Sequence, residues 1–206
     1  MSGAFPISTS KFSTMGIRSS QNTIISLTDS GKKLARQIDG QRFGFTAKII
    51  TAKRNDAYGE LMAFIIKQRS GKENFTIIPP EVKNARGNET GTIQVVGSHA
   101  VGATSISIDG HQNNNPNAFK AGDFIKFANH SKIYMIVADV NPSSNASTLT
   151  IEPPLINTLA DNEVVTYDNV PFTVYLTNDI QEFGAVGATK DGDLLYQFEL
   201  DVEEAL

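Results

Sequence analysis

The chain has 206 residues, so one domain or two can bury enough apolar surface to fold without covalent staples. It contains no cysteine, which excludes disulfides and thiolate metal sites and fits assembly in a reducing compartment. Only 19% of residues are charged, and Asn, Ser, Thr and Gly are abundant, a composition typical of β-sandwiches and β-barrels rather than of helical enzymes. We find no secretion signal and no apolar run near the ~20 residues that cross a bilayer, so we expect no membrane partner.

Charge is unevenly distributed along the chain, although the net charge is only −4. Residues 1–89 hold 14 Lys+Arg and 7 Asp+Glu, a net charge of +7, whereas residues 90–168 hold 3 and 7, a net charge of −4. Residues 169–206 hold 1 and 8, a net charge of −7. Because opposite charges offset self-repulsion when they fold side by side, this pattern favours one domain built from both ends. Accidental clustering is the alternative.

The N-terminal region is predicted to hold an arm and several short strands. Residues 1–22 show neither helical nor strand periodicity and indicate an extended arm, either a mobile terminus or a segment that docks on a neighbouring subunit. Strands are predicted at 22–28, 32–38 and 43–51. A further short strand at 75–78 is ended by two prolines.

One helix is predicted between these strands. Asn55 or Asp56 can cap its start, and Gly71 is expected to end it. Its apolar arc spans roughly 200°, whereas a surface helix needs only about 100°. The apolar side chains are Tyr58, Leu61, Met62, Phe64, Ile65 and Ile66. Either the helix is sunk in a groove of its own domain, or part of the arc contacts another chain.

A compact set of strands follows a polar, glycine-bearing boundary at 81–90. The five predicted strands are 92–96, 104–109, 123–128, 132–140 and 148–152. Five strands in about 65 residues is the size of an OB-type barrel.

The central hairpin of this barrel has a strand that is apolar on both faces. Ile133, Met135 and Val137 point to one face, while Tyr134 and Ile136 point to the other. We therefore expect this strand to be covered on both sides.

Two long strands are predicted after residue 166, at 172–177 and 194–203. In the second, Leu194, Tyr196, Phe198, Leu200 and Val202 point inward, against Leu195, Gln197, Glu199, Asp201 and Glu203 outward. This strand needs a sheet to join, and the strands before residue 80 supply it. The predicted fold is mainly β (β-rich α+β). A split β-barrel or sandwich-like domain with one helix is formed by residues 1–89 (arm 1–22) and 166–206, and a small five-stranded OB-like barrel, residues 90–165, is inserted in it.

The residues indicate no catalytic, cofactor or metal site. His99, His111 and His130 lie in or beside predicted turns at spacings that match no metal signature, so solvent-exposed turn residues are expected. The Asp-Gly-Asp at 191–193 lacks the later ligands of a calcium loop and indicates a hairpin turn. Phosphate-binding, nucleophile-elbow and zinc-protease motifs are absent, so no enzyme is expected.

The polar loop 110–117 is the longest excursion of the predicted barrel. Such loops are usually only solvated, but a ligand of the barrel would contact this one. The candidate ligand residues are His111, Asn113, Asn114 and Asn115. The basic excess of residues 1–89 lacks the interleaved aromatic residues of nucleic-acid binders, so we interpret it as a partner for the acidic C-terminal strand.

The order of elements resembles the distal tail proteins of long-tailed bacteriophages, particularly the siphophage type with a small OB-like insert. An arm, a few strands, one helix, a short strand ending in proline and an inserted barrel are followed by two long strands and an acidic Glu-Glu-Ala-Leu end. The barrel carries the hairpin segment Lys-Ala-Gly-Asp-Phe-Ile-Lys-Phe. The resemblance is closest at 120–134, at 172–176 and in the last strand, and weakest at 1–50.

The resemblance implies a structural virion protein without enzymatic activity or cofactor. It implies a hexameric ring at the distal end of the tail tube, a homo-oligomer that joins the tail tube protein to a baseplate hub or tail fibre protein. DNA is expected to pass through the central channel without specific binding. The expected location is the virion tail tip, after assembly in the host cytoplasm.

Two groups of residues are candidates for this role. Phe12, Tyr58, Phe64 and Ile66 are predicted to contribute to the ring interface. Glu199, Asp201 and Glu203 are predicted either to pair with basic residues of the N-terminal half or to line the channel. Two alternative functions share this sequence pattern: a tail tube or tail-completion protein with the same β core, and a carbohydrate-binding module on the virion.

Overall fold

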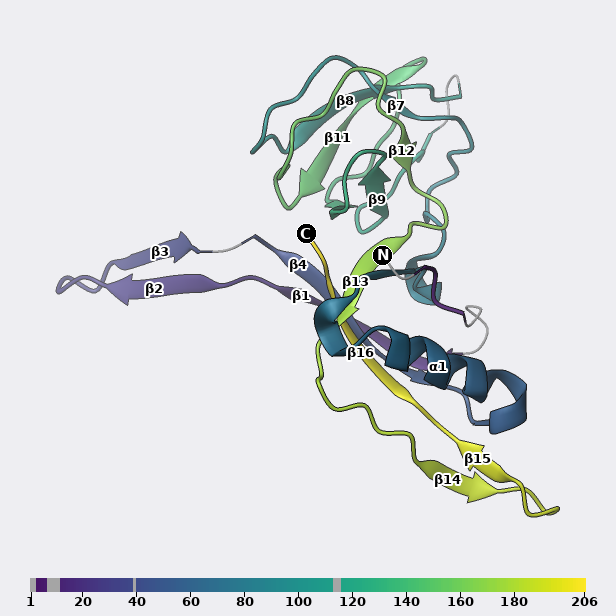
Figure 1. The fold of residues 1–206 in the computed structure, drawn as a ribbon. Helices are drawn as coiled ribbons and strands as arrows, with labels where there is room; N and C mark the ends of the chain where they lie inside the picture. The colour runs from purple at the N-terminus through teal and green to yellow at the C-terminus, as the bar shows by residue number, and fades with distance from the viewer. Residues whose placement is uncertain (1–2, 7–11, 39, 113–115) are drawn as a thin grey trace.

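The computed structural model describes residues 3–6, 12–38, 40–112 and 116–206. Its main sheet has five antiparallel strands in the order β1-β4-β16-β13-β6 and joins both ends of the chain (Figure 1). The strands are β1 (Phe12–Ser20), β4 (Arg42–Ile49), β16 (Glu199–Glu204), β13 (Phe172–Leu176) and β6 (Phe75–Ile77). The predicted domain built from both ends is therefore present, with β4 and β16 in direct register.

The helix α1 (Gly59–Lys67) lies on this sheet and buries Leu61 and Ile65. It follows β5 (Ala52–Lys53) and a π-helical turn, Arg54–Tyr58. Short 3-10 turns, Ser70–Lys72 and Pro80–Val82, come later. Within the described residues no helix has both the length and the apolarity to span a membrane.

The predicted ends of the helix are wrong. No side chain caps α1, whose preceding residue is the helical Tyr58 rather than Asn55 or Asp56, because the π-helical turn runs directly into it. The helix ends at Lys67, before Gly71, since Arg69 adopts a left-handed conformation with φ of 54°.

The prediction of an extended N-terminal arm is wrong for most of the described part of residues 1–22. β1 pairs with β4 along its whole length, from Phe12 opposite Ile49 to Ser20 opposite Arg42. As an edge strand, β1 is only partly buried, so its sequence lacks the strict alternation of a covered strand.

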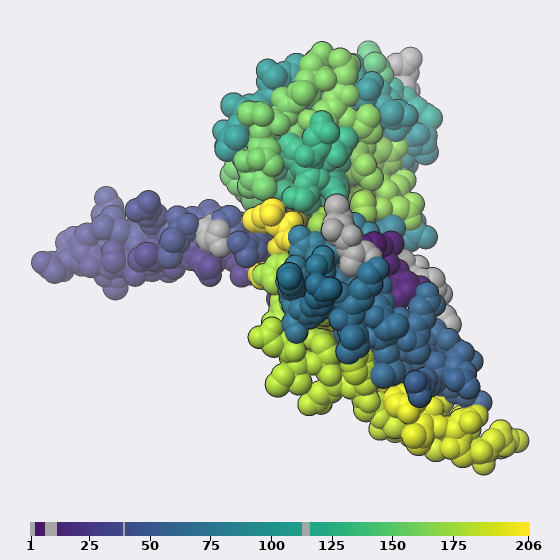
Figure 2. Space-filling model, in the orientation of Figure 1, coloured from purple at the N-terminus to yellow at the C-terminus, as the bar shows by residue number. Residues whose placement is uncertain are grey.

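Two pairs of strands extend beyond the body of the molecule. β2 (Thr23–Leu27) and β3 (Lys33–Gln37) form a two-stranded hairpin that continues β1 and β4 outward (Figure 1). β14 (Ala185–Ala188) and β15 (Leu194–Tyr196) form a three-stranded sheet with β5. Figure 2 shows both as separate projections.

The predicted last strand is divided in two. In its second half, Leu200 and Val202 of β16 and the preceding Phe198 are buried, as expected. Its first half, β15, leaves the main sheet to pair with β14 and β5, which exposes Leu194.

The inserted barrel has six strands, one more than predicted. They are β7 (Gln94–Val95), β8 (Ser105–Asp109), β9 (Phe124–Phe127), β10 (Ile133–Ile136), β11 (Ala146–Glu152) and β12 (Val165–Thr166). The sheet order is β12-β9-β10-β11-β8-β7. Hydrogen bonds from Val95 N to Glu163 O and from Val165 N to Ile93 O, both 2.9 Å, bring its two edges together into a nearly closed barrel. The two-residue β12 was too short to be predicted.

The β9–β10 hairpin contributes to both hydrophobic cores. Tyr134 and Ile136 lie in the barrel core, whereas Phe124 and Ile133 lie in the core of the main sheet and helix. The prediction that this strand is covered on both sides is confirmed, except that Val137 lies beyond it and is exposed.

A buried ion pair lies at this junction. The Lys132 Nζ is 2.5 Å from the Glu204 Oε2, and both side chains are fully buried. Glu204 also accepts hydrogen bonds from the backbone N–H of Ile133 (2.5 Å) and of Phe43 (3.1 Å). Burial lowers the pKa of the Lys132 ammonium, and the Glu204 carboxylate opposes that shift. One carboxylate thus joins the barrel, β4 and β16.

We predict that Lys132→Met lowers the free energy of unfolding by about 3–5 kcal/mol, because it leaves the Glu204 carboxylate buried without its cation. The double variant Lys132→Met/Glu204→Gln should recover part of this loss, since it removes the buried charge and the amide oxygen still accepts one of the two backbone hydrogen bonds. Chemical denaturation measures both. The control Lys48→Met breaks an exposed pair and should cost less than about 1 kcal/mol. A Lys132→Met variant as stable as Lys48→Met would contradict the prediction.

Candidate functional site

The β2–β3 hairpin exposes all of its residues and carries an unusual amount of apolar surface. Its large apolar side chains are between 49% and 70% exposed. They are Ile24, Ile25, Leu27, Leu34 and the adjoining Ile38. Isolated two-stranded hairpins are at best marginally stable in water, so such a surface fits a contact with another chain.

The hairpin is also basic. It contains three cations, Lys32, Lys33 and Arg36, but only one acidic residue, Asp29. Among the described residues none of these three cations forms an ion pair. The hairpin therefore offers both apolar and cationic groups to a partner.

Three of the four predicted interface residues pack within their own chain. Tyr58 is fully buried and stacks on Tyr196 at 4.9 Å between ring centroids, so it has no surface to offer a neighbour, which corrects the prediction. Phe12 and Phe64 are partly buried against Phe5, at 6.0 and 5.6 Å. They hold the N-terminal segment to the helix.

The fourth, Ile66, lies on the outer face of α1 and is 65% exposed. The remaining apolar residues of the predicted wide arc are wholly or partly buried in the chain's own core. Most of the arc therefore follows the alternative in which the helix is sunk in its own domain.

The acidic residues of β16 contact the N-terminal half of the chain. Glu199 lies 3.7 Å from the Lys48 ammonium, and Asp201 lies 2.5 Å from the Arg18 guanidinium. Glu203 accepts a hydrogen bond from the Tyr175 hydroxyl at 2.7 Å. Two of the three carboxylates thus make the contacts expected from charge pairing.

Asp201 is the most closely held of these carboxylates. Thr46 and Thr177 donate hydrogen bonds to it at 3.2 and 2.7 Å, in addition to Arg18. Burial raises the pKa of the Asp201 carboxyl, but the hydrogen bonds from Arg18 and Thr177 outweigh this effect and leave the pKa below its usual value. Asp201 is therefore held as a carboxylate.

A hollow of about 370 Å³ lies beside these residues. We call it the acidic hollow. It is lined by Thr46, Asn178, Ile180, Gln181, Glu182, Glu199 and Asp201. Ile180 is 79% exposed, the highest value for a large apolar side chain in the described part of the chain.

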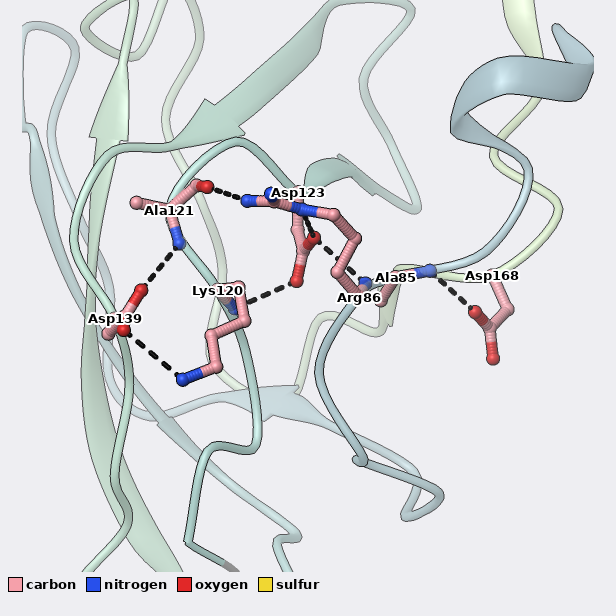
Figure 3. A network of polar contacts seen from close by, with 7 residues as sticks. All are labelled: Ala85, Arg86, Lys120, Ala121, Asp123, Asp139 and Asp168. Carbon is pink, nitrogen blue, oxygen red and sulfur yellow. Dashed lines mark hydrogen bonds and ion pairs between the residues drawn. The ribbon is translucent and has the colours of Figure 1, made fainter.

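The Lys-Ala-Gly-Asp segment fixes the point where the chain enters the barrel (Figure 3). Asp123 accepts hydrogen bonds from the backbone N–H of Arg86 (2.9 Å) and of Lys120 (2.8 Å). The Arg86 guanidinium donates to the Ala121 carbonyl. Gly122 has φ of +98°, and a Cβ there would lie 3.0 Å from the Arg86 side chain, so glycine suits this position.

Two further contacts complete this network. Asp139 accepts from the Ala121 N–H (2.9 Å) and lies 3.2 Å from the Lys120 ammonium. The Ala85 N–H donates to Asp168 at 3.0 Å, which joins the segment that enters the barrel to the segment that leaves it. The segment therefore has a structural role.

The prediction that the histidines are solvent-exposed turn residues is wrong for two of them. His130 is buried and lies 3.2 Å from the Tyr134 hydroxyl. His111 is buried between Glu89 and Ser147, with Nδ1 2.7 Å from the Glu89 Oε2 and Nε2 2.6 Å from the Ser147 Oγ. His99 remains partly exposed, and its Nε2 accepts the Ser107 N–H at 3.3 Å.

The proposed ligand loop is only partly described. The His111 side chain lies inside the barrel and not on an accessible surface. Asn113, Asn114 and Asn115 lie outside the described residues. A hydrogen-bonded series of an acid, a histidine and a serine, here Glu89, His111 and Ser147, also occurs in hydrolases. In this protein the side chains of Glu89 and His111 are fully buried and hold the loop to the barrel.

The Asp-Gly-Asp turn forms the predicted hairpin between β14 and β15. Gly192 has φ of +87°, and Asp193 pairs with Lys53 at 2.6 Å. In the described part of the chain no group of three or more potential ligands is placed to hold a metal ion.

Residues 81–170 match the family model described as "Distal tail protein pb9, B domain". Residues 81–170 are thus similar to a domain of a phage distal tail protein. The matched range covers the six-stranded barrel together with the entry and exit segments that Ala85 and Asp168 join. A search of curated proteins found no match. The resemblance recognised in the sequence is thereby confirmed, and the distal tail protein has a structural role in the virion tail.

We predict that Glu89 makes the free energy of unfolding depend on pH in the acidic range. Burial raises the pKa of its carboxyl, but hydrogen bonds from His111 and the Gly91 N–H outweigh this effect and leave the pKa below its usual value. Its stabilisation is present above the unfolded pKa of about 4.3 and is lost as pH falls through the lower folded value. Glu89→Gln should therefore lose less unfolding free energy than the wild type between about pH 6 and pH 3.

Urea denaturation at a series of pH values measures this difference. Glu152→Gln, at an exposed position of the same barrel, is the matched control and should keep the wild-type dependence. An acid dependence of Glu89→Gln equal to that of the control would contradict the prediction.

Proposed function

We propose that this distal tail protein forms a ring of six copies at the tip of the tail, between the tail tube protein and a baseplate hub or tail fibre protein. The ring leaves a central channel through which DNA passes without specific binding. The match to a distal tail protein domain supports the location. The observation that carries the ring is the fully exposed β2–β3 hairpin with its apolar side chains.

Burial of the exposed apolar side chains of this hairpin against another chain would favour assembly. Full burial of a large aliphatic side chain is worth about 1.5–3 kcal/mol, and several here are half exposed or more. A second copy of the chain meets the hairpin with the same geometry at every contact. When one surface repeatedly contacts a different surface of the next copy, the assembly closes into a ring if the rotation permits.

The charge of the chain fits a channel that does not retain DNA. The net charge is −4, and residues 169–206 carry −7. Affinity for DNA depends mainly on cations that neutralise phosphates, and an acidic wall lacks them. DNA is therefore expected to slide past the ring without a specific site.

The ring is tested on the purified full chain by light scattering and negative-stain electron microscopy. Thr23 and Gln37 are register partners, so a two-residue Asn-Gly turn can replace the residues between them. We expect rings from the wild type and a folded monomer from this shortened variant, because the apolar contact is lost.

Val137→Asp, a change at an exposed apolar residue of the barrel, is the control and should still form rings. A wild type that stays monomeric, or a shortened variant that still forms rings, would contradict the proposal.

A further inference from the structure

The acidic hollow has the features of a docking site for a basic, apolar segment. Ile180 stands exposed at its edge, and Glu182, Glu199 and Asp201 contribute carboxylates to its lining. A hollow of about 370 Å³ has room for side chains of another segment.

Some charges at the hollow are already paired and others are not. Glu199 and Asp201 have Lys48 and Arg18 as partners. Glu182 and the neighbouring Asp179 form no ion pair with any described residue. Glu182 therefore lines the hollow with the exposed Ile180 and has no cation partner among the described residues, and Asp179 precedes Ile180 in the sequence without lining the hollow.

The β2–β3 hairpin carries the complementary groups. Ile25 and Leu27 are two residues apart on one strand, so they share a face. Lys33 lies opposite Leu27, and Arg36 opposite Ile24, on the partner strand. Lys33 therefore shares a face with Ile25 and Leu27, whereas Arg36 lies on the other face with Ile24 and Leu34. Each face of the hairpin thus combines a cation with exposed apolar side chains.

The hairpin of the same copy extends away from the body (Figures 1 and 2), and none of its residues lines the acidic hollow. We propose that the β2–β3 hairpin of one copy docks in the acidic hollow of the next copy. This inference rests on the proposed ring and names the two surfaces that form it. Since the two surfaces differ, each copy gives its hairpin to one neighbour and receives the hairpin of the other.

The contact combines two kinds of interaction with different roles. Ile25 and Leu27 lose exposed apolar surface against Ile180, which favours binding at any salt concentration. Lys33, which shares the face of Ile25 and Leu27, meets Glu182, and Arg36 on the other face of the hairpin is attracted to Asp179 at longer range. These charges set the orientation, and salt weakens their attraction. Assembly is therefore expected to weaken, but not vanish, as ionic strength rises.

Two charge-reversed variants test the docking. The hairpin variant is Lys33→Glu/Arg36→Glu, and the hollow variant is Asp179→Lys/Glu182→Lys. Each alone should assemble at least tenfold more weakly than the wild type in sedimentation velocity, because like charges then face each other at every interface.

An equal mixture of the two variants should assemble again. The unchanged hairpin of the hollow variant matches the unchanged hollow of the hairpin variant, and the two reversed surfaces match each other. Alternating copies thus restore complementary charge at every contact in a ring with an even number of copies. Thermal unfolding of each variant checks that the fold is intact.

Lys190→Glu, a charge reversal at the tip of the other projecting hairpin, is the control and should assemble like the wild type. Rings formed normally by either single variant, or no recovery in the mixture, would overturn the docking while leaving the ring itself in place. A wild type that forms no ring would overturn the proposed function and the docking together.

Discussion

The buried carboxylate of Glu204 is the constraint on which the arrangement of this molecule depends. It accepts hydrogen bonds from the Phe43 and Ile133 backbones and pairs with Lys132, so three distant parts of the chain meet at one group. A buried charge is tolerated only when such partners are present, and the loss of any of them is costly. The pair therefore fixes the barrel on the main sheet, where the shared β9–β10 hairpin already contributes apolar side chains to both cores.

Exposed apolar side chains lie outside these two cores, on the projecting hairpins. The β2–β3 and β14–β15 hairpins project in different directions (Figure 2). Every residue of β2 and β3 is exposed, whereas β15 pairs with β5 and its Tyr196 stacks on Tyr58. Polar networks, in contrast, are largely satisfied within the body, as the Arg86 and Asp123 contacts at the entrance of the barrel illustrate. Closed cores with an exposed apolar hairpin are the arrangement that the proposed ring requires.

The strands that were predictable from the sequence are those whose apolar residues recur with a clear period. β4, β13, β16 and the β9–β10 hairpin alternate or are apolar on both faces, so their strands and the fold class were predictable. β1 was missed because an edge strand is only partly covered. The burial of His111 and Lys132 was not predictable, since each lies near a turn and is buried by an acid 22 or 72 residues away. Apolarity alone selected Tyr58 as an interface residue, although it is core, and did not reveal that the β2–β3 hairpin stands free.

The central claim is that this protein occupies the tip of the phage tail, and electron microscopy of intact particles with a gold-tagged antibody tests it most directly. We expect label confined to the distal end of the tail, at the junction with the baseplate hub or fibre. Label along the whole tail would identify a tube protein instead, and the absence of label from particles would contradict the structural role at the tail tip.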